Sequence, residues 1–143
     1  MARTKAGLFF IKTLDGGPPA MRELPVKIST AYYEGQVLRM SATSGSVGRQ
    51  AAAGTSVYGI AGADVASSAT ISTMPVYLAV TNNCFEAVWA SPNVSNVRTK
   101  RGDKVDFAVA TVHNYRLSTA TTNRHFNVIE PHPDNLTGTL TQN

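Results

Sequence analysis

Short apolar segments with a period of two recur along this chain, and they limit its fold more than any other feature. Apolar residues occupy every second position in segments 74–80, 85–89 and 105–109. Such alternation is typical of β-strands, because successive side chains of a strand point to opposite faces. No segment of ten or more residues has a convincing apolar period of 3.6, which would indicate an amphipathic helix. The pattern therefore predicts an all-β fold.

Turn-forming residues divide the chain into many short strands. Asn82 and Asn83 separate two alternating segments, and they predict a hairpin between residues 74–81 and 85–89. Glycines mark further turns, at positions 35, 45, 48, 54, 59, 62 and 102. Short strands with a turn about every 8 to 12 residues are typical of a small barrel or sandwich.

The alternation also predicts which side chains form the core. The residues expected to be buried together are Val76, Leu78, Phe85, Trp89, Val105, Phe107 and Val109. Lys104 and Asp106 take the opposite positions of their strand, so we expect both to point outward.

The two ends of the chain differ from this middle part. The apolar run Leu8-Phe9-Phe10-Ile11 is separated from the rest by glycines and prolines at 16–19. Burial of this apolar run requires a surface, which is either that of its own barrel or that of a neighbouring subunit. The tail alternates leucine and glycine with threonine, and it either adds a strand to an exposed sheet edge or frays. We therefore expect an extended N-terminal arm over 1–24, a β-barrel domain over 25–131 and a C-terminal tail over 132–143.

The composition favours a protein that is partly covered by other subunits. Charged residues make up 15% of the chain, whereas about 25% is usual for a soluble domain, and the net charge is +4. The uncovered apolar runs lead us to expect a homo-oligomer, with a trimer preferred. The single cysteine, Cys84, excludes an intrachain disulfide. No apolar stretch approaches the roughly 18 residues of a membrane span, so no membrane partner is expected.

Residues with catalytic or metal-binding chemistry are not arranged in any familiar pattern. His113, His125 and His132 do not have zinc-type spacing, and we expect surface or turn histidines. Asp103 and Asp106 are three positions apart, which places them on opposite faces of a strand. Nucleophile-elbow, phosphate-loop and HExxH patterns are absent from the sequence. We therefore expect no catalytic residues, no metal, no cofactor and no enzymatic activity.

The densest basic cluster consists of Arg98, Lys100, Arg101 and Lys104. It suits phosphates or acidic side chains of a partner, or it is a solvated loop. The tyrosines lie away from this cluster in the sequence, so aromatic residues that would stack on bases are not interleaved with it. A nucleic-acid partner is therefore not favoured.

Four motifs in a fixed order carry a resemblance to a known family. They are Gly35-Gln36-Val37-Leu38, Gly59-Ile60-Ala61, Phe85-Glu86-Ala87 and Gly102-Asp103-Lys104-Val105. Their order and spacing over residues 32–109 resemble the small head proteins of tailed bacteriophages known as capsid decoration, or cement, proteins.

The resemblance implies a β-barrel or β-tulip-like domain on the outer surface of an icosahedral shell. Its partners would be the major capsid protein and sister subunits, commonly in a trimer, and its role would be head stabilisation without a catalytic site. The contacts expected are those of Leu8, Phe9, Phe10 and Ile11 in the arm and of Arg98, Lys100 and Arg101 in the basic cluster.

Three alternatives remain beside this interpretation. One is another minor head or tail component of the same virion. The second is a nucleic-acid-binding β-barrel that uses residues 98–104, and its affinity for DNA would fall steeply with salt. The third is a small enzyme, which the missing catalytic patterns disfavour.

Overall fold

The structure is a computed structural model of the 143-residue chain. It describes residues 7–41, 45–50, 56–89, 102, 104–111, 114–118, 125–131 and 137–142. The regular elements in these ranges are β1 (Phe9–Thr13), β2 (Met21–Pro25), β3 (Val37–Met40), β4 (Val47–Arg49), β5 (Gly59–Ala61), β6 (Thr73–Leu78), β7 (Asn83–Val88), β8 (Lys104–Val105), β9 (Phe107–Thr111), β10 (Asn114–Leu117), β11 (Phe126–Pro131) and β12 (Thr137–Gln142). The all-β prediction is confirmed.

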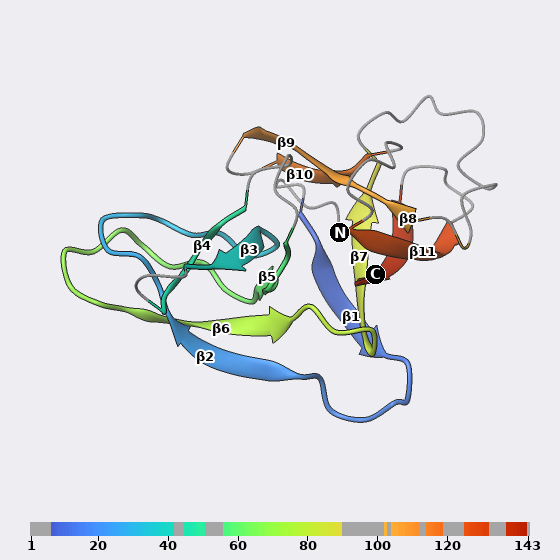
Figure 1. The fold of residues 1–143 in the computed structure, drawn as a ribbon, viewed down its shortest axis with the longest axis horizontal. Coiled ribbons are helices and arrows are strands. Elements are labelled where there is room, and N and C mark those ends of the chain that lie inside the picture. The colour runs from blue at the N-terminus through green and yellow to red at the C-terminus, as the bar shows by residue number, and fades with distance from the viewer. Residues whose placement is uncertain are drawn as a thin grey trace.

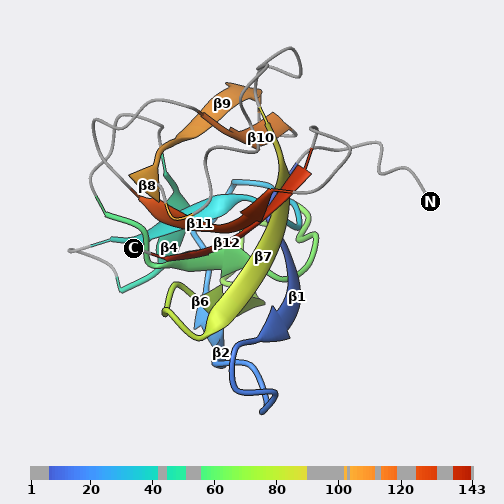
Figure 2. The same cartoon turned by 90° about the vertical axis from the view of Figure 1, so that its right-hand side faces the viewer.

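The strands form three antiparallel sheets. One five-stranded sheet, which we call the β7 sheet, has the order β1-β7-β12-β11-β8. The other, the β6 sheet, has the order β2-β6-β5-β3-β4, and β9 pairs with β10 in a two-stranded ribbon. In Figure 1 the β6 sheet lies on the left, the β7 sheet on the right and the ribbon above. Figure 2 shows β7 running between β1 and β12.

The β6 sheet curls without closing into a barrel. A single parallel bridge between Val26 and Val47 links its two edges. The buried hydroxyl of Tyr32 donates a hydrogen bond of 3.1 Å to the carbonyl oxygen of Val47 and supports this junction. Among the described residues this bridge does not extend into a ladder, so the strands of the expected small β-barrel or β-tulip-like domain form two five-stranded sheets and a ribbon without closing.

Two clusters of buried side chains form the core. The larger one joins the β7 sheet, the ribbon and, through Val37 and Ile60, the β6 sheet. It contains four of the residues expected there, Phe85, Trp89, Val105 and Phe107, with Val109 packed against it. The smaller one lies in the β6 sheet and contains Val76. Leu78 is only half-buried. The predicted strand faces are thus confirmed for most positions, but the single core becomes two.

The hairpin predicted across Asn82 and Asn83 is not present. β6 pairs with β2 and β5, whereas β7 pairs with β1 and β12, so the chain changes sheets between them. The amide nitrogen of the buried Asn83 side chain donates to the carbonyl oxygens of Ala20 and Leu78, both at 3.0 Å. This side chain fixes a corner where a hairpin turn was expected.

The segment expected to be a free arm is part of the fold over residues 7–24. β1 pairs with β7, and β2 pairs with β6. Leu8 is fully buried in the larger core cluster, and its N–H donates to the carbonyl oxygen of Gly35 at 3.0 Å. Of the two placements left open above, the structure has the run folded onto its own domain, because pairing and burial remove much of its apolar surface from water.

The C-terminal segment is also a structural strand. β12 lies between β7 and β11, with Gly138 opposite Ala87 and Val128 opposite Leu140. It therefore has an inner position in the β7 sheet and not an edge position. A threonine-rich segment suits this position because β-branched residues favour extended backbone.

Candidate interaction surfaces

Six large hydrophobic side chains are exposed among the described residues, and five of them fall into two groups. Ile11, Leu14 and Met21 lie within one stretch of chain, in β1, in the turn after it and at the start of β2, and we call them the N-terminal patch. Ile28 and Ile71 line a cleft in the β6 sheet. The sixth, Ile129, lies on β11. Large apolar side chains that stay exposed are candidates for contact with a partner.

Hydrogen bonds hold the turn that presents the N-terminal patch. The Thr13 hydroxyl donates to the carbonyl oxygen of Gly17 at 2.7 Å, and the Gly17 N–H donates to Asp15 Oδ1 at 2.8 Å. The Leu14 N–H donates to the carbonyl oxygen of Asn82 at 2.9 Å. Leu14 is 56% exposed although its backbone is fixed. The turn therefore holds an apolar side chain in solvent. The loop between β1 and β2, which contains this turn, lies at the lower edge of the molecule in Figure 1.

An acidic side chain stands next to this leucine. The hydrogen bond from the Gly17 N–H holds the pKa of Asp15 below its usual value, and the Asn82 and Thr13 side chains act in the same direction. Asp15 is therefore ionised at neutral pH. The patch combines apolar contact area with a negative charge at its rim.

Ile11 lies where the edge of the β7 sheet is interrupted. β1 is the outermost strand on that side of the described sheet, and its register with β7 shifts between Phe10 and Lys12. A bulge and an exposed lysine both discourage another strand from pairing with an edge. A partner of the patch would therefore be bound mainly through side chains.

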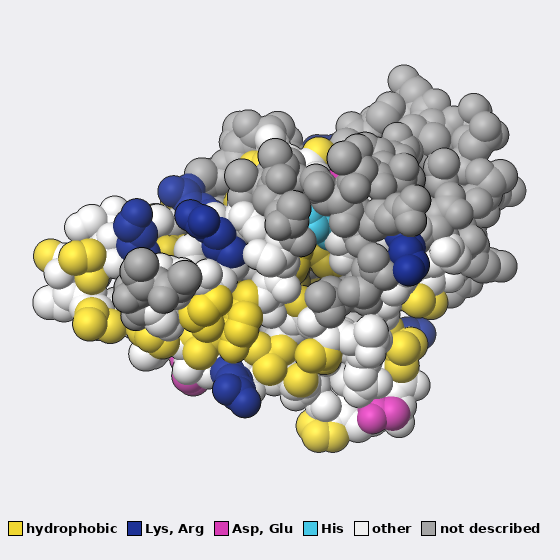
Figure 3. Space-filling model, viewed as in Figure 1, with side chains coloured by type: hydrophobic (Ala, Val, Ile, Leu, Met, Phe, Trp, Pro, Cys, Tyr) yellow, Lys and Arg dark blue, Asp and Glu magenta, His cyan; other side chains and the backbone are white. Residues whose placement is uncertain are grey.

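The cleft lies between the end of β2 and the β3–β4 pair. It has a volume of about 570 Å³. Figure 3 shows lysine and arginine side chains gathered over β3 and β4, next to a band of hydrophobic side chains. The residues that line it are Pro25, Val26, Lys27, Ile28, Arg39, Ser41, Ser46, Val47, Gly48 and Ile71.

The thiol of Cys84 and the hydroxyls of Tyr32 and Tyr115 are buried and neutral at pH 7. Burial raises the pKa of the Cys84 thiol, and the charge of Lys12 opposes this shift. Burial also raises the pKa of the Tyr32 and Tyr115 hydroxyls, against the positive charge of Arg49. A buried neutral thiol is a poor nucleophile, so Cys84 has the character of a core residue.

His125 and Asp106 do not lie at the surface as expected. His125 Nδ1 is 3.7 Å from Asp106 Oδ1, both side chains are buried, and the His125 ring lies 4.8 Å from that of Phe107. Asp106 is the residue between β8 and β9, which belong to different sheets, so Val105 and Phe107 on either side of it are buried too. Within the described ranges, no group of three or more His, Cys, Asp or Glu residues is placed to hold a metal ion.

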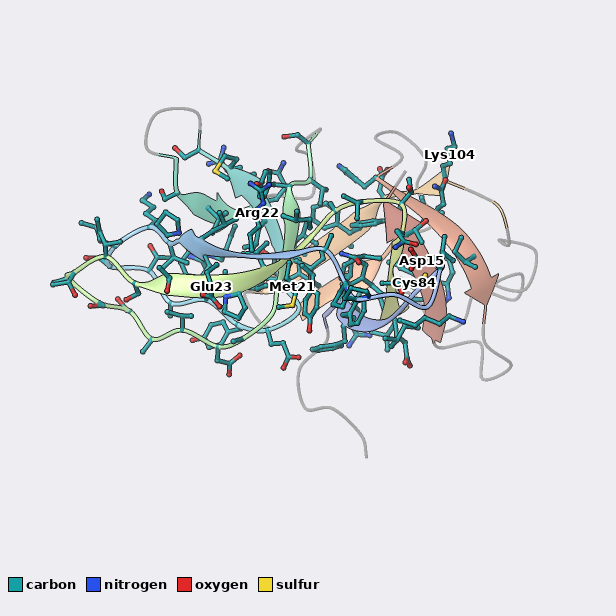
Figure 4. All side chains as sticks on the ribbon, turned by 90° about the horizontal axis from the view of Figure 1, so that it is seen from below. Asp15, Met21, Arg22, Glu23, Cys84 and Lys104 are labelled. Atoms are coloured by element: carbon teal, nitrogen blue, oxygen red, sulfur yellow. The ribbon has the colours of Figure 1, made fainter. Side chains whose placement is uncertain are left out.

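Of the residues predicted to contact a partner, the structure describes the four of the apolar run. Leu8 is buried, Phe9 and Phe10 are half-buried, and Ile11 is 39% exposed. Arg98, Lys100 and Arg101 lie outside the described residues, as do His113 and His132. Lys104 is exposed as expected and points away from the molecule in Figure 4.

Sequence reasoning missed most of both surfaces. The missed residues are Leu14, Met21, Lys27, Ile28, Arg39 and Ile71. Leu14 carries a local signal, since it is a large apolar residue directly before the turn formers Asp15-Gly16-Gly17. The cleft carries no such signal, because its walls come from segments far apart in the sequence.

The four motifs behind the family resemblance lie in the core. They fall on β3, β5, β7 and the entry to β8, where their apolar side chains are buried. Comparison with protein-family models, curated proteins and solved structures found no match. In the part of the chain that the structure describes, no helix has the length and apolar character needed to cross a membrane.

Proposed function

We propose that this protein is a structural component of a tailed-bacteriophage head that binds the outer surface of the capsid and stabilises the shell. The observation that carries the proposal is the N-terminal patch. Ile11, Leu14 and Met21 are exposed, yet the strands before and after their turn are anchored in the two large sheets. A rigid segment with uncovered apolar side chains suits a partner surface that exists outside this chain.

The binding of many copies to one shell explains how the protein would stabilise it. Each copy would gain roughly 25 cal/mol for every Å² of apolar surface that it buries on the shell. A protein that binds the assembled shell and not the free capsid subunit stabilises the assembled form by mass action. Many copies that bridge neighbouring capsid subunits would add avidity to modest contacts. The major capsid protein is the partner that this role requires.

The family resemblance supports the proposal at the level of the fold. Its motifs supply core residues such as Val37, Ile60 and Phe85, so they bear on how the domain packs and not on which face binds. The binding face is inferred separately, from the exposed side chains.

Self-association is part of the same proposal. A homotrimer on the shell would cover apolar surface that a monomer leaves exposed, in keeping with the 15% charged content. Light scattering on the purified protein measures this mass in solution. A monomer both in solution and on the shell would contradict it.

The function is tested by mixing the purified protein with empty shells and sedimenting them. Wild-type protein is expected to sediment with the shells. A Leu14→Ser/Met21→Ser double variant should bind at least about tenfold more weakly, because two large apolar side chains contribute several kcal/mol when fully buried. Ile129→Ser is the matched control, since Ile129 is exposed elsewhere, and it should bind like the wild type. Failure of the wild type to bind would contradict the proposed function. Equal binding by the double variant would contradict the proposal that the N-terminal patch is the surface that contacts the shell.

A further inference from the structure

The cleft in the β6 sheet has a charge of one sign. Lys27 and Arg39 are the charged residues in its lining, and both are exposed. Neither forms an ion pair with any residue that the structure describes. The serines at 41 and 46 add hydroxyl groups to the same lining. Two cations in the lining of a cleft, neither of them paired with a described acidic residue, favour a ligand with carboxylate or phosphate groups.

The backbone leaves open space beside one of these cations. Arg39 lies opposite Gly48 in the β3–β4 register, so both face the same side of the sheet. A Cβ atom built on Gly48 would meet no other atom within 4 Å. The position across from Arg39 is therefore unfilled, and a ligand group can approach the guanidinium from that side.

The rest of the lining is aliphatic. Ile28 is 49% exposed and Ile71 is 75% exposed, and both stand beside the half-buried Pro25. Exposure of such side chains to water is unfavourable, and contact with an apolar ligand group would relieve it. The cleft thus offers apolar contact next to positive charge. None of the described residues that line it is aromatic, so the described lining has no ring on which a base would stack.

We propose that this cleft binds an extended acidic segment of a partner protein, in which carboxylate side chains alternate with aliphatic ones. Carboxylates of the segment would meet Lys27 and Arg39, while its aliphatic side chains would cover Ile28 and Ile71. In an extended segment, alternate side chains point to opposite sides. The carboxylates would therefore point to one side, toward the cations, while the aliphatic side chains point to the other, toward the isoleucines. The proposal does not depend on the capsid function, because the N-terminal patch is a separate surface.

The test is a selection from a library of random twelve-residue peptides on the intact protein. Peptides that also bind a Lys27→Glu/Arg39→Glu variant are removed by counter-selection. The expected result is enrichment of sequences that alternate Asp or Glu with Val, Ile or Leu. The dissociation constant of one selected peptide is then measured by calorimetry with each variant.

The variants separate the charge from the apolar contact. Lys27→Glu/Arg39→Glu should weaken binding by at least about tenfold, and Ile71→Ser by about threefold or more. Arg22→Glu is the control, because Arg22 is also an exposed arginine of the β6 sheet but is not in the lining of the cleft, and it should change the affinity less than about twofold. Figure 4 shows Arg22 and Glu23 on opposite sides of β2. All four positions are exposed, so unchanged NMR spectra of the remaining residues are expected to show that each variant folds.

Several outcomes would overturn the proposal. These are a selection that yields no peptide dependent on Lys27 and Arg39, enriched peptides without acidic residues, and equal binding by the Ile71→Ser variant. A single-stranded oligonucleotide that displaces the selected peptide at equal concentration would assign the cleft to nucleic acid instead. Loss of shell binding with peptide binding intact would overturn the capsid function and leave this proposal standing.

Discussion

The rings of Phe10 and Tyr77 stack on each other, with centroids 4.6 Å apart and planes 8° from parallel. Phe10 belongs to β1 of the β7 sheet, and Tyr77 belongs to β6 of the other sheet. The ring of Phe85 meets both of them edge-on, at 6.2 and 6.4 Å. The N-terminal segment therefore joins the two sheets, and the patch that it carries has a fixed position on the molecule.

Phe10→Ala should lower the free energy of unfolding by about 2 to 4 kcal/mol, because it removes a half-buried ring between the sheets. A double-mutant cycle with Tyr77→Ala should give a coupling of about 0.5 to 1.5 kcal/mol for the ring pair. Urea unfolding monitored by circular dichroism measures both. Ile11→Ala, one residue away and exposed, is the control and should change stability by less than about 1 kcal/mol. A Phe10 variant as stable as this control would mean that the stack does not join the sheets.

Removal of residues 1–13 should abolish the native fold, because it takes away Leu8 from the core and exposes the edge of β7. The measurement is the dispersion of amide signals in an NMR spectrum. Deletion of residues 1–6 retains Leu8 and β1, so that shorter protein is expected to keep a dispersed spectrum. A folded 14–143 fragment would show that the segment is an appendage after all.

Gly59→Ala should destabilise the protein by about 1 to 3 kcal/mol. A Cβ atom at Gly59 would lie 2.5 Å from Val76 Cγ1 and 2.6 Å from the carbonyl oxygen of Tyr77, so the core of the β6 sheet would have to move. Gly48→Ala is the matched control on a strand of the same sheet, where the added methyl meets nothing within 4 Å. Thermal unfolding of both variants decides this, and equal melting temperatures would refute the packing described around β5.

Stability should fall as the pH rises above about 9. Burial raises the pKa of Cys84, Tyr32 and Tyr115, whose ordinary values are 9.0, 10.0 and 10.0. The unfolded chain loses these protons first, so the unfolded state binds fewer protons at alkaline pH and becomes favoured there. The contribution is complete below the unfolded pKa values and is lost above them, by at most about 1.4 kcal/mol per pH unit for each group.

Urea unfolding between pH 7 and 11 measures this slope. Cys84→Ala should reduce the decrease in the free energy of unfolding that begins near pH 9. Tyr115→Phe should reduce the decrease that begins near pH 10. A slope unchanged in both variants would show that these groups ionise alike in the folded and unfolded states.

Strand faces could be predicted from the sequence where a strand stays within one sheet. Phe85, Ala87 and Trp89 are buried at alternate positions as expected, because one face of β7 covers the larger core cluster. Alternation failed at Asp106, where the chain passes from one sheet to another and three consecutive residues are buried.

Sheet membership could not be predicted, because it depends on contacts between distant residues. β6 and β7 are neighbours in the sequence, but the hydrogen bonds of Asn83 with Ala20 turn the chain into a different sheet. β12 pairs with β7 about fifty residues earlier in the chain. The cleft has the same origin, since Lys27, Arg39 and Ile71 meet only after the β6 sheet has curled.

Electron cryomicroscopy of phage shells decorated with this protein tests the proposed function, because one map gives the location, the copy number and the face in contact. We expect density for the protein over the whole outer surface, with Ile11, Leu14 and Met21 turned toward the shell or a sister subunit. Density confined to one vertex or to the tail would contradict a decoration role and favour a minor head or tail component. A decorated shell in which all three side chains face solvent would contradict the proposed binding surface.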